Sequence, residues 1–286
     1  MKAFCLSKQC LNLKGNQVPQ GGGCNLPVED HEIPRHRGQR VLQRAFMVPK
    51  RSKNLENGLP VGRLIMDVRQ TNSLMICLAG DLPAMALPTQ FLTMVLGETE
   101  TFVFSGEDLV SSFYLCSLPA PWAAWFTFER EIPGEVVGLT GRKRLGACVL
   151  PMGFSGATGV LQSWHRSLAL PEDGSGGLDP EREFRRDRAR PSQQVGGPSM
   201  WSIYLDDFTD VELMELLDAI EVQGTPSAAQ RLIRRQYARH RVPRNADKAM
   251  LREILAERLG YFFNGFTGWM GISNQRAADT LTLGLE

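Results

Sequence analysis

Two adjacent carboxylates that follow an apolar run constrain the folding of this chain more than any other feature. The run is residues 201–208, with the sequence WSIYLDDF. Residues 203–205 predict a buried strand, because isoleucine, tyrosine and leucine in succession favour strands. Asp206 and Asp207 then lie where the strand ends in a tight turn. Burying two bare carboxylates is strongly unfavourable, so this turn needs water, basic partners or a cation.

Two interpretations of this acidic pair are open. Asp-Asp is ordinary turn chemistry, and the octapeptide taken alone favours a plain β-hairpin. The alternative is a site for a hard divalent cation, which prefers carboxylate and carbonyl oxygens. The choice depends on whether other acidic residues reach the same place in the fold.

A second acidic position strengthens the cation interpretation. Asp108 follows a short apolar segment at residues 101–104, as Asp206 follows its own strand. Two strands placed side by side would bring both carboxylates to one edge of a sheet. Catalytic sites with two cations about 3.5–4 Å apart need such an arrangement. The separation of 206 − 108 = 98 residues excludes a local turn, so the contact must be tertiary.

Length and charge set wide limits on the class of protein. The chain has 286 residues, of which 43% are hydrophobic, enough for one large domain or two modest ones. With 32 basic against 31 acidic residues, the overall charge does not indicate a nucleic-acid partner. Arginine is dense at residues 182–190 and 231–244, which predicts either solvated faces or contacts with phosphate.

Targeting signals and cysteine usage indicate an intracellular protein. No apolar run approaches the roughly 20 residues of a membrane helix, and residues 1–25 lack the apolar core of a secretory signal. The six cysteines are scattered and we interpret them as reduced thiols. A zinc site near the start is disfavoured, because the gap from Cys10 to His31 is long. We expect a location in the cytoplasm or nucleus, without secretion or membrane attachment.

The coarse pattern of elements alternates short strands with amphipathic segments. Residues 43–49 and 63–69 predict a hairpin whose basic tip carries Lys50 and Arg51. Residues 171–199 are rich in glycine, proline and charged residues, which predicts a flexible insertion. Helices are expected where apolar residues recur with helical spacing, at residues 89–95, 156–168, 211–222, 227–241 and 247–259.

Four segments, in this order, resemble the fingers and palm of a reverse transcriptase, the RNA-directed DNA polymerase of retroelements. Residues 63–72 (RLIMDVRQTN) resemble a fingers strand. Residues 108–113 (DLVSSF) resemble the first palm motif, in which an aromatic residue follows an aspartate by five positions. Residues 150–155 (LPMGFS) resemble the turn before a palm helix, and residues 204–207 (YLDD) the Y-x-D-D box. The resemblance covers about residues 43–210, with a fainter similarity to residue 260.

The resemblance implies an α+β fold. A polymerase palm with an antiparallel sheet backed by helices would follow a fingers hairpin region, with the thumb absent or truncated. The flexible insertion then enlarges the loop between the third and fourth motifs. Glu107 stands where an apolar residue normally precedes the first aspartate, which leaves the strand register there open. The expected ranges are a poorly ordered leader at residues 1–40, a fingers-like region at 41–100, a palm-like region at 101–260 containing the insertion at 171–199, and a tail at 261–286.

The resemblance also implies a reaction, its cofactors and its residues. Nucleotides would be transferred from a dNTP to a primer 3′-hydroxyl on an RNA or DNA template, with two Mg²⁺ ions, or Mn²⁺, as cofactors. The catalytic, metal-binding residues are Asp108, Asp206 and Asp207, assisted by the Leu109 carbonyl. The implied nucleotide contacts are Lys50, Arg51 and Arg63 at the triphosphate, Phe113 as a gate against a 2′-hydroxyl, and Met152, Gly153 and Phe154 at the base pair. Tyr204 would touch the primer end, and Lys248 is the candidate for assisting pyrophosphate departure.

Two other functions are compatible with the same segments. A catalytically degenerate palm would keep the fold and only bind nucleic acid or a protein partner. An RNA-templated RNA polymerase would use the same acids, but Phe113 argues against it, because the resemblance implies that a bulky ring at that position selects deoxynucleotides.

Overall fold

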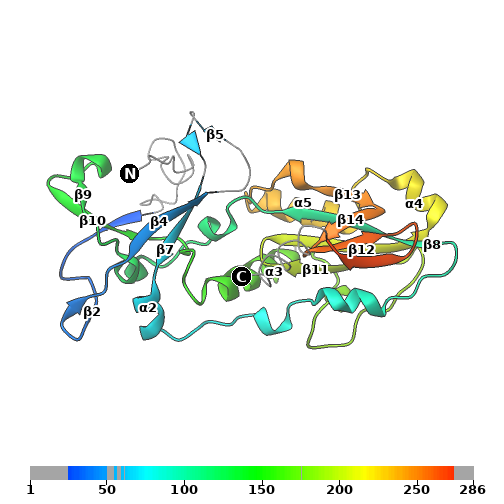
Figure 1. The fold of residues 1–286 in the computed structure, drawn as a ribbon, viewed down its shortest axis with the longest axis horizontal. Helices are drawn as coiled ribbons and strands as arrows, with labels where there is room; N and C mark the ends of the chain where they lie inside the picture. Colours follow the sequence, from blue (N-terminus) through cyan, green and yellow to red (C-terminus); the bar gives the residue numbers. More distant parts are fainter. Residues whose placement is uncertain (1–24, 50–54, 57–58, 61, 175, 274–286) are drawn as a thin grey trace, which may run out of the picture. The chain divides into compact units, whose positions relative to one another are not determined.

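The chain forms two compact units that interleave along the sequence (Figure 1). The computed structural model describes residues 25–49, 55–56, 59–60, 62–174 and 176–273. Unit 1 comprises Met1–Ala79 and Ser111–Val160, and unit 2 comprises Gly80–Val110 and Leu161–Glu286. Most of the predicted leader lies outside the described residues. The names fingers-like and palm-like that we gave to ranges of sequence stay predictions.

Unit 2 is built on a four-stranded antiparallel sheet with the strand order β11-β12-β8-β13. β11 and β12 form a hairpin. β12 pairs with β8 along its full length, from Glu215 opposite Glu100 to Asp207 opposite Asp108. The antiparallel sheet expected from the sequence is confirmed. Its strands are β8 (Glu100–Asp108), β11 (Met200–Tyr204), β12 (Asp207–Glu215) and β13 (Met250–Glu253).

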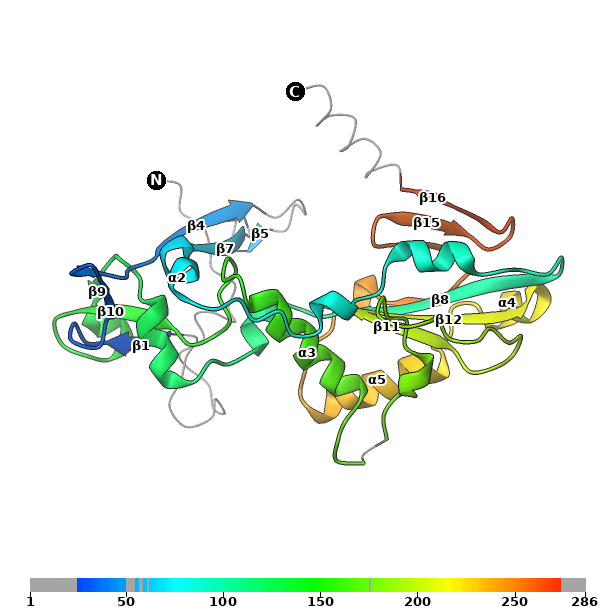
Figure 2. The same ribbon diagram turned by 90° about the horizontal axis from the view of Figure 1, so that it is seen from below.

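Helices cover one face of this sheet and a second sheet covers the other (Figure 2). The helical layer contains α4 (Leu216–Val222), α5 (Ala228–Arg239) and the part of α3 (Ala157–Ala169) that begins at Leu161. The opposite layer is the antiparallel sheet of β14 (Leu255–Arg258), β15 (Tyr261–Asn264) and β16 (Trp269–Ile272). The α+β fold, with a sheet backed by helices, is therefore confirmed.

Local sequence explains why α5 forms. The Ser227 side chain accepts a hydrogen bond from the backbone N–H of Gln230 at 2.9 Å, which caps the first turn. The buried residues recur three and four positions apart and so form one face of the helix, at Ala229, Gln230, Ile233, Gln236 and Tyr237. The helices predicted at residues 227–241 and 156–168 are both confirmed as α5 and α3.

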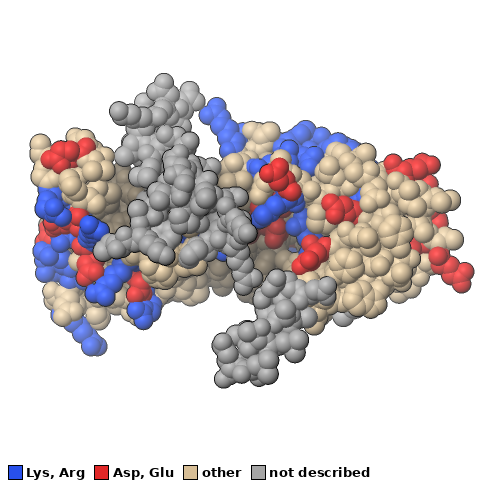
Figure 3. Space-filling model, turned by 45° about the horizontal axis from the view of Figure 1, so that its top comes forward, with Lys and Arg blue, Asp and Glu red and all other residues tan. Residues whose placement is uncertain are grey.

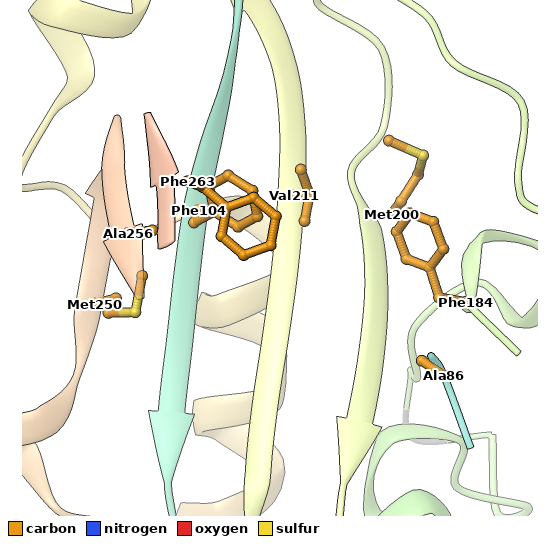
Figure 4. Packing of buried hydrophobic residues seen from close by; sticks show 8 residues of the cluster. All are labelled: Ala86, Phe104, Phe184, Met200, Val211, Met250, Ala256 and Phe263. Carbon is orange, nitrogen blue, oxygen red and sulfur yellow. The ribbon is translucent and has the colours of Figure 1, made fainter. Parts of the chain in front are cut away.

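An aromatic core fills the space between the two sheets of unit 2 (Figure 4). The ring of Phe104, on β8, lies 4.6 Å from the ring of Phe263, on β15, measured between centroids. Phe91 lies 5.3 Å from Phe263 and 4.9 Å from Phe184. Tilted and edge-on aromatic pairs at these distances stabilise a core beyond the area that they bury.

The segment expected to be a flexible insertion is packed onto unit 2 in its described part. Phe184 is 2% exposed, and its backbone N–H donates to the carbonyl of Trp201, a residue of β11, at 2.7 Å. The buried Glu183 carboxylate accepts hydrogen bonds from Arg166 of α3, the shortest at 2.9 Å. The predicted flexibility is therefore wrong for the described part of this segment. Composition alone cannot reveal a tertiary contact such as the one between Glu183 and Arg166.

Unit 1 contains a β-hairpin, a three-stranded sheet and an aromatic cluster. The hairpin pairs β4 (Arg44–Pro49) with β7 (Gly62–Asp67), as predicted from residues 43–69. The sheet has the order β1-β10-β9. Phe154 lies 5.3 Å from Phe126 and 6.3 Å from Trp122 between ring centroids. The elements are β1 (Asn25–Val28), β9 (Ile132–Pro133), β10 (Arg142–Ala147), α2 (Arg69–Leu74) and the short pairs β2 (Arg35–His36) with β3 (Gln39–Arg40) and β5 (Leu55–Glu56) with β6 (Leu59–Pro60).

Short 3₁₀ helices connect the longer elements in both units. The segment expected to be a helix at residues 89–95 is one of them. They are η1 (Leu82–Ala84), η2 (Pro88–Thr93), η3 (Ser112–Leu115), η4 (Ala120–Phe126), η5 (Gly134–Val137), η6 (Pro180–Arg182) and η7 (Ala246–Lys248). Among the described residues, no helix is long and apolar enough to cross a membrane.

One helix prediction is right only in its second half, and another is wrong. In the range 211–222, the chain continues as β12 to Glu215 and only then forms α4. The range 247–259 contains η7, β13 and β14 instead of a helix. Apolar residues in both ranges fit a helical period and a strand period equally well. Pairing with β8 and β15, which no local pattern contains, decides for strands.

Candidate functional site

The pairing of β8 with β12 puts three acidic residues at one end of the unit 2 sheet. Asp108 ends β8 and is the register partner of Asp207, the first residue of β12. Asp206 precedes it in the turn, and its backbone carbonyl accepts a hydrogen bond from the N–H of Leu109 at 3.0 Å. We name Asp108, Asp206 and Asp207 the acidic edge. The sequence predicts this contact, because Asp108 and Asp206 each follow an apolar strand and two such strands were expected to lie side by side.

Two basic residues contact the acidic edge. Lys248, in η7, places Nζ 3.1 Å from both carboxylate oxygens of Asp108. Arg258, the last residue of β14, places Nη1 3.4 Å from Oδ1 of Asp207. Lys248 was among the residues implied by the resemblance. Arg258 was missed, because its range was expected to be helical and nothing local indicates its partner.

The charge of Asp207 depends on these neighbours. Burial raises the pKa of Asp207 to about 6, Arg258 opposes the rise, and the carboxylates of Asp206 and Asp108 add to it. Like charges within reach of one another disfavour the ionised form. Burial is thus the main cause of the raised pKa of Asp207, and the neighbouring carboxylates add to it. A cation bound there would favour the ionised form.

Glu107 precedes Asp108 on β8, and its side chain contacts α5. It is completely buried and accepts hydrogen bonds from Arg234 Nε at 2.6 Å, Gln230 Nε2 at 2.7 Å and Arg244 Nη1 at 3.2 Å. These partners explain how a carboxylate occupies a position expected to be apolar. The register of β8, which Glu107 left open, is continuous with β12.

The Arg258 side chain crosses β8 at Gly106. A Cβ atom at position 106 would lie 1.6 Å from Nη2 of Arg258. Alternation along the strand puts Gly106 and Asp108 on one face and Glu107 on the other. The glycine thus leaves the space through which Arg258 reaches Asp207.

Tyr204 and Leu109 flank the acidic edge within unit 2. Tyr204 ends β11, is half-buried and is the register partner of Asp207. Leu109 is 2% exposed and forms an isolated bridge with Arg244. Both residues therefore lie beside the acids, as the resemblance implies, although their roles stay predictions.

In unit 1, one asparagine joins two of the four motif segments. Asn72 donates from Nδ2 to the Gly153 carbonyl at 3.0 Å and accepts at Oδ1 from the Ser155 N–H at 3.0 Å. The carbonyl of Met152 accepts from the Met66 N–H at 3.0 Å. Gly153 has a φ of 116°, and a Cβ there would lie 2.3 Å from the Met66 carbonyl oxygen, so this turn requires glycine.

The other nucleotide-contact candidates of unit 1 have different surroundings. Arg63 is exposed on β7, and Phe113 is half-buried in η3. Phe154 is 4% exposed within the aromatic cluster, so its ring serves the core of unit 1. In the same turn, Met152 is half-buried and Gly153 is exposed. Lys50 and Arg51 lie outside the described residues.

Comparison with known proteins shows similarity at the level of structure. No family model matches the sequence, and no curated protein matches it. Two solved structures of the foamy viral protease-reverse transcriptase, both in complex with double-stranded DNA, superpose on 91% of the chain with TM-scores of 0.55 and 0.54 and 13% identity.

The fold is reverse-transcriptase-like. The chain spans 34% and 40% of the length of the two solved chains that it resembles. At this identity the similarity concerns the fold alone. The reverse-transcriptase-like fold agrees with the order of the four motif segments.

The acidic edge has the type of ligand atom that magnesium prefers, but its side chains are not arranged around one metal position. Carboxylate and carbonyl oxygens are the donors that Mg²⁺ prefers. Within the part of the chain that the structure describes, however, no three Asp, Glu, His or Cys side chains are grouped as a metal site. Asp108 and Asp207 instead form ion pairs with Lys248 and Arg258. The donor type therefore suits the ion, the described side chains are not gathered around a metal position, and metal binding would compete with these ion pairs.

On the face in Figure 3, charge does not single out a binding surface. Lysine and arginine are mixed with aspartate and glutamate over the face in Figure 3, in keeping with the net charge of +1. On that face no continuous surface of one sign appears among the described residues. Contact with a polyanion there would depend on individual basic residues rather than on a broad field.

Proposed function

We propose that this protein is a template-directed DNA polymerase of the reverse transcriptase type. The observation that carries the proposal is the acidic edge, in which Asp108 pairs with Asp207 and Asp206 occupies the adjoining turn. A reverse-transcriptase-like fold with acids at this strand end is the arrangement that metal-dependent nucleotidyl transfer needs. The substrates would be dNTPs and a primer on an RNA or DNA template.

Each group of the acidic edge has a separate role in this proposal. Asp108, Asp206 and the Leu109 carbonyl would hold two Mg²⁺ ions, or Mn²⁺, and Asp207 would complete the negative region. When bound, these ions supply charge neutralisation at the transferred phosphate and activate the primer hydroxyl. Lys248, whose Nζ lies on the Asp108 carboxylate, would be the group that donates to the leaving pyrophosphate.

Unit 1 would supply the contacts to the nucleotide. Arg63 is exposed and carries the charge and donors that suit a triphosphate. Met152 and Gly153 would meet the base pair at a turn that Asn72 holds. Phe113 would select deoxynucleotides. Tyr204 of unit 2 would contact the primer end.

Primer extension by single-residue variants tests the proposal. Asp206→Asn keeps the size of the side chain and removes its charge, so we expect extension with Mg²⁺ or Mn²⁺ to fall more than about 100-fold. Asp218→Asn, an exposed acid on α4, is the matched control and should extend like wild type. Undiminished extension by Asp206→Asn would end the proposal.

A catalytically degenerate palm is the second candidate. The ion pairs of Lys248 with Asp108 and of Arg258 with Asp207 favour it, because they neutralise acids that catalysis would need for cations. Such a protein would bind a nucleic acid or a protein partner and extend no primer. Salt-dependent binding of a primer–template by wild type, without extension in either metal, would identify this alternative.

A further inference from the structure

The turn that carries Asp206 has an uncommon backbone conformation. Leu205, between β11 and β12, has a φ of 55°, in the left-handed region. Two-residue hairpin turns use positive φ, and glycine or asparagine normally occupies such positions because their steric cost is low. A leucine there needs contacts that hold the backbone in place.

Gln162 of α3 supplies two of these contacts. Its Oε1 accepts a hydrogen bond from the N–H of Leu205 at 2.7 Å, and its Nε2 donates to the Ile203 carbonyl at 3.0 Å. The Gln162 side chain thus binds the end of β11 and the turn together. Gln162 is 2% exposed, so water does not compete for these bonds.

His165 lies one helical turn further along α3 and supplies the third contact. Its Nδ1 is 2.6 Å from the Leu205 carbonyl oxygen, and its Nε2 is 2.6 Å from the Tyr237 hydroxyl. A carbonyl oxygen can only accept, so Nδ1 carries the hydrogen and Nε2 accepts from Tyr237. Both residues are buried, which makes this chain of hydrogen bonds rigid.

The turn is therefore held from two sides. Side chains of α3 satisfy both backbone polar groups of Leu205, and Tyr237 ties that helix to α5. On the other side, the N–H of Leu109 binds the Asp206 carbonyl at 3.0 Å. Ordinary core packing would not require two buried polar side chains to converge on one backbone residue.

We propose that Gln162 and His165 are positioning residues that set the Leu205 turn and thereby the placement of Asp206 and Asp207. Tyr237 orients the His165 ring. This inference rests on the metal-dependent function proposed above. Groups that orient metal ligands typically change metal affinity or activity by about 10- to 100-fold when they are replaced.

The test compares removal of the contact with its conservative replacement. His165→Leu removes the donor to Leu205, whereas His165→Asn keeps a side-chain N–H where Nδ1 stands. Gln162→Leu removes both bonds of the amide. Ser167→Ala is the matched control on α3, because the Ser167 hydroxyl bonds to Trp164 on the exposed side of the helix. Each full-length variant is measured for Mn²⁺ affinity, for primer extension with kcat and KM separated, and for Tm.

We expect His165→Leu and Gln162→Leu to weaken Mn²⁺ binding by about 10- to 100-fold and to lower kcat more than they raise KM for dNTP. His165→Asn should recover most of the Mn²⁺ affinity, and Ser167→Ala should match wild type. Variants that lose Tm while the folded protein keeps wild-type Mn²⁺ affinity would overturn the inference, since they would show only a structural role.

The failure of this inference is distinct from that of the proposed function. A wild-type protein that binds Mn²⁺ and extends no primer would overturn the polymerase proposal. The Mn²⁺ affinities of the variants would then still decide whether Gln162 and His165 position the turn. A wild-type protein that binds no Mn²⁺ would overturn both.

Discussion

Lys248 has two possible roles that experiment can separate. It neutralises Asp108, and it is the candidate for assisting the leaving group. Its Nζ bonds both oxygens of Asp108, yet its side chain is 63% exposed. Exposed ion pairs contribute little free energy, because water and salt screen them. Lys248 can therefore leave Asp108 at low cost when a stronger cation arrives.

Replacing Lys248 by methionine should change metal binding and primer extension in opposite directions. Without the competing ammonium group, we expect Lys248→Met to bind Mn²⁺ more tightly, by less than about fivefold. Primer extension at saturating metal should fall if Lys248 assists the leaving group. Lys143→Met, from the lysine–glutamate pair of unit 1, is the control for loss of a surface ion pair. Weaker Mn²⁺ binding by Lys248→Met would contradict the competition.

Asp210 makes stability depend on pH. Burial raises the pKa of Asp210 to about 8, the neighbouring Glu212 adds to the rise, and the hydroxyls of Ser227 and Ser199 oppose it. The folded protein thus holds a proton that the unfolded chain releases near pH 4. The stability from this group is complete below that pH and is lost as the pH rises to about 8.

Asp210→Asn should remove this dependence. We expect the difference in unfolding free energy between variant and wild type to shift in favour of the variant from pH 4 to pH 8. Denaturant unfolding at several pH values measures it, and the difference cancels the contributions of other titrating groups. A difference that stays constant across this window would show that Asp210 does not hold the proton.

At the scale of elements, buried charge joins α5 to β8. Glu107 is the centre of this contact, with Arg234 and Gln230 from α5 and Arg244 from the segment after it. These contacts hold α5 against β8 next to Asp108, whose register is set by the pairing of β8 with β12.

Glu107→Gln should destabilise unit 2 markedly. The change leaves two guanidinium groups, 23% and 35% exposed, facing a neutral amide. Breaking a buried ion pair costs about 3–5 kcal/mol, and we expect about 2 kcal/mol here because both arginines are partly hydrated. Denaturant unfolding measures the loss. Glu129→Gln, from an exposed ion pair with Arg44, is the control and should leave the midpoint unchanged.

At the scale of the whole molecule, the residues implied for one reaction are divided between two compact units. The acidic edge belongs to unit 2, and Arg63, Phe113, Met152 and Gly153 belong to unit 1. The division between units passes between Val110 and Ser111, inside the first palm-like motif. The residues that the resemblance implies thus do not all belong to one unit.

Phe113 is the implied gate against a 2′-hydroxyl, so its replacement should change nucleotide selectivity. We expect Phe113→Ala to admit ribonucleotides, raising the ratio of rNTP to dNTP incorporation by at least about tenfold, since a lost steric clash is worth one or more kcal/mol. Primer extension with each nucleotide measures the ratio. Phe128→Ala is a control for loss of a phenylalanine in unit 1. An unchanged ratio in Phe113→Ala would remove the gate from the proposal.

The strands that carry the acids, their turn and the helix α5 could be predicted from the sequence. Apolar residues at residues 203–205 before two aspartates, and the Ser227 cap before α5, are local signals that survive in the folded chain. The meeting of Asp108 with the Y-x-D-D segment followed from the resemblance and from the chemistry of paired carboxylates.

Other features depend on partners that are distant in the sequence. The strands β12 and β13 replaced expected helices because β8 supplies their hydrogen bonds. Arg258 reaches Asp207 across Gly106, and Gln162 reaches the Leu205 turn from α3. Local sequence thus determined the candidate acids and the short elements that carry them, since propensity and turn chemistry act over a few residues. Only the tertiary structure decided which charges and amides hold those acids, because each such contact joins segments that no local pattern connects.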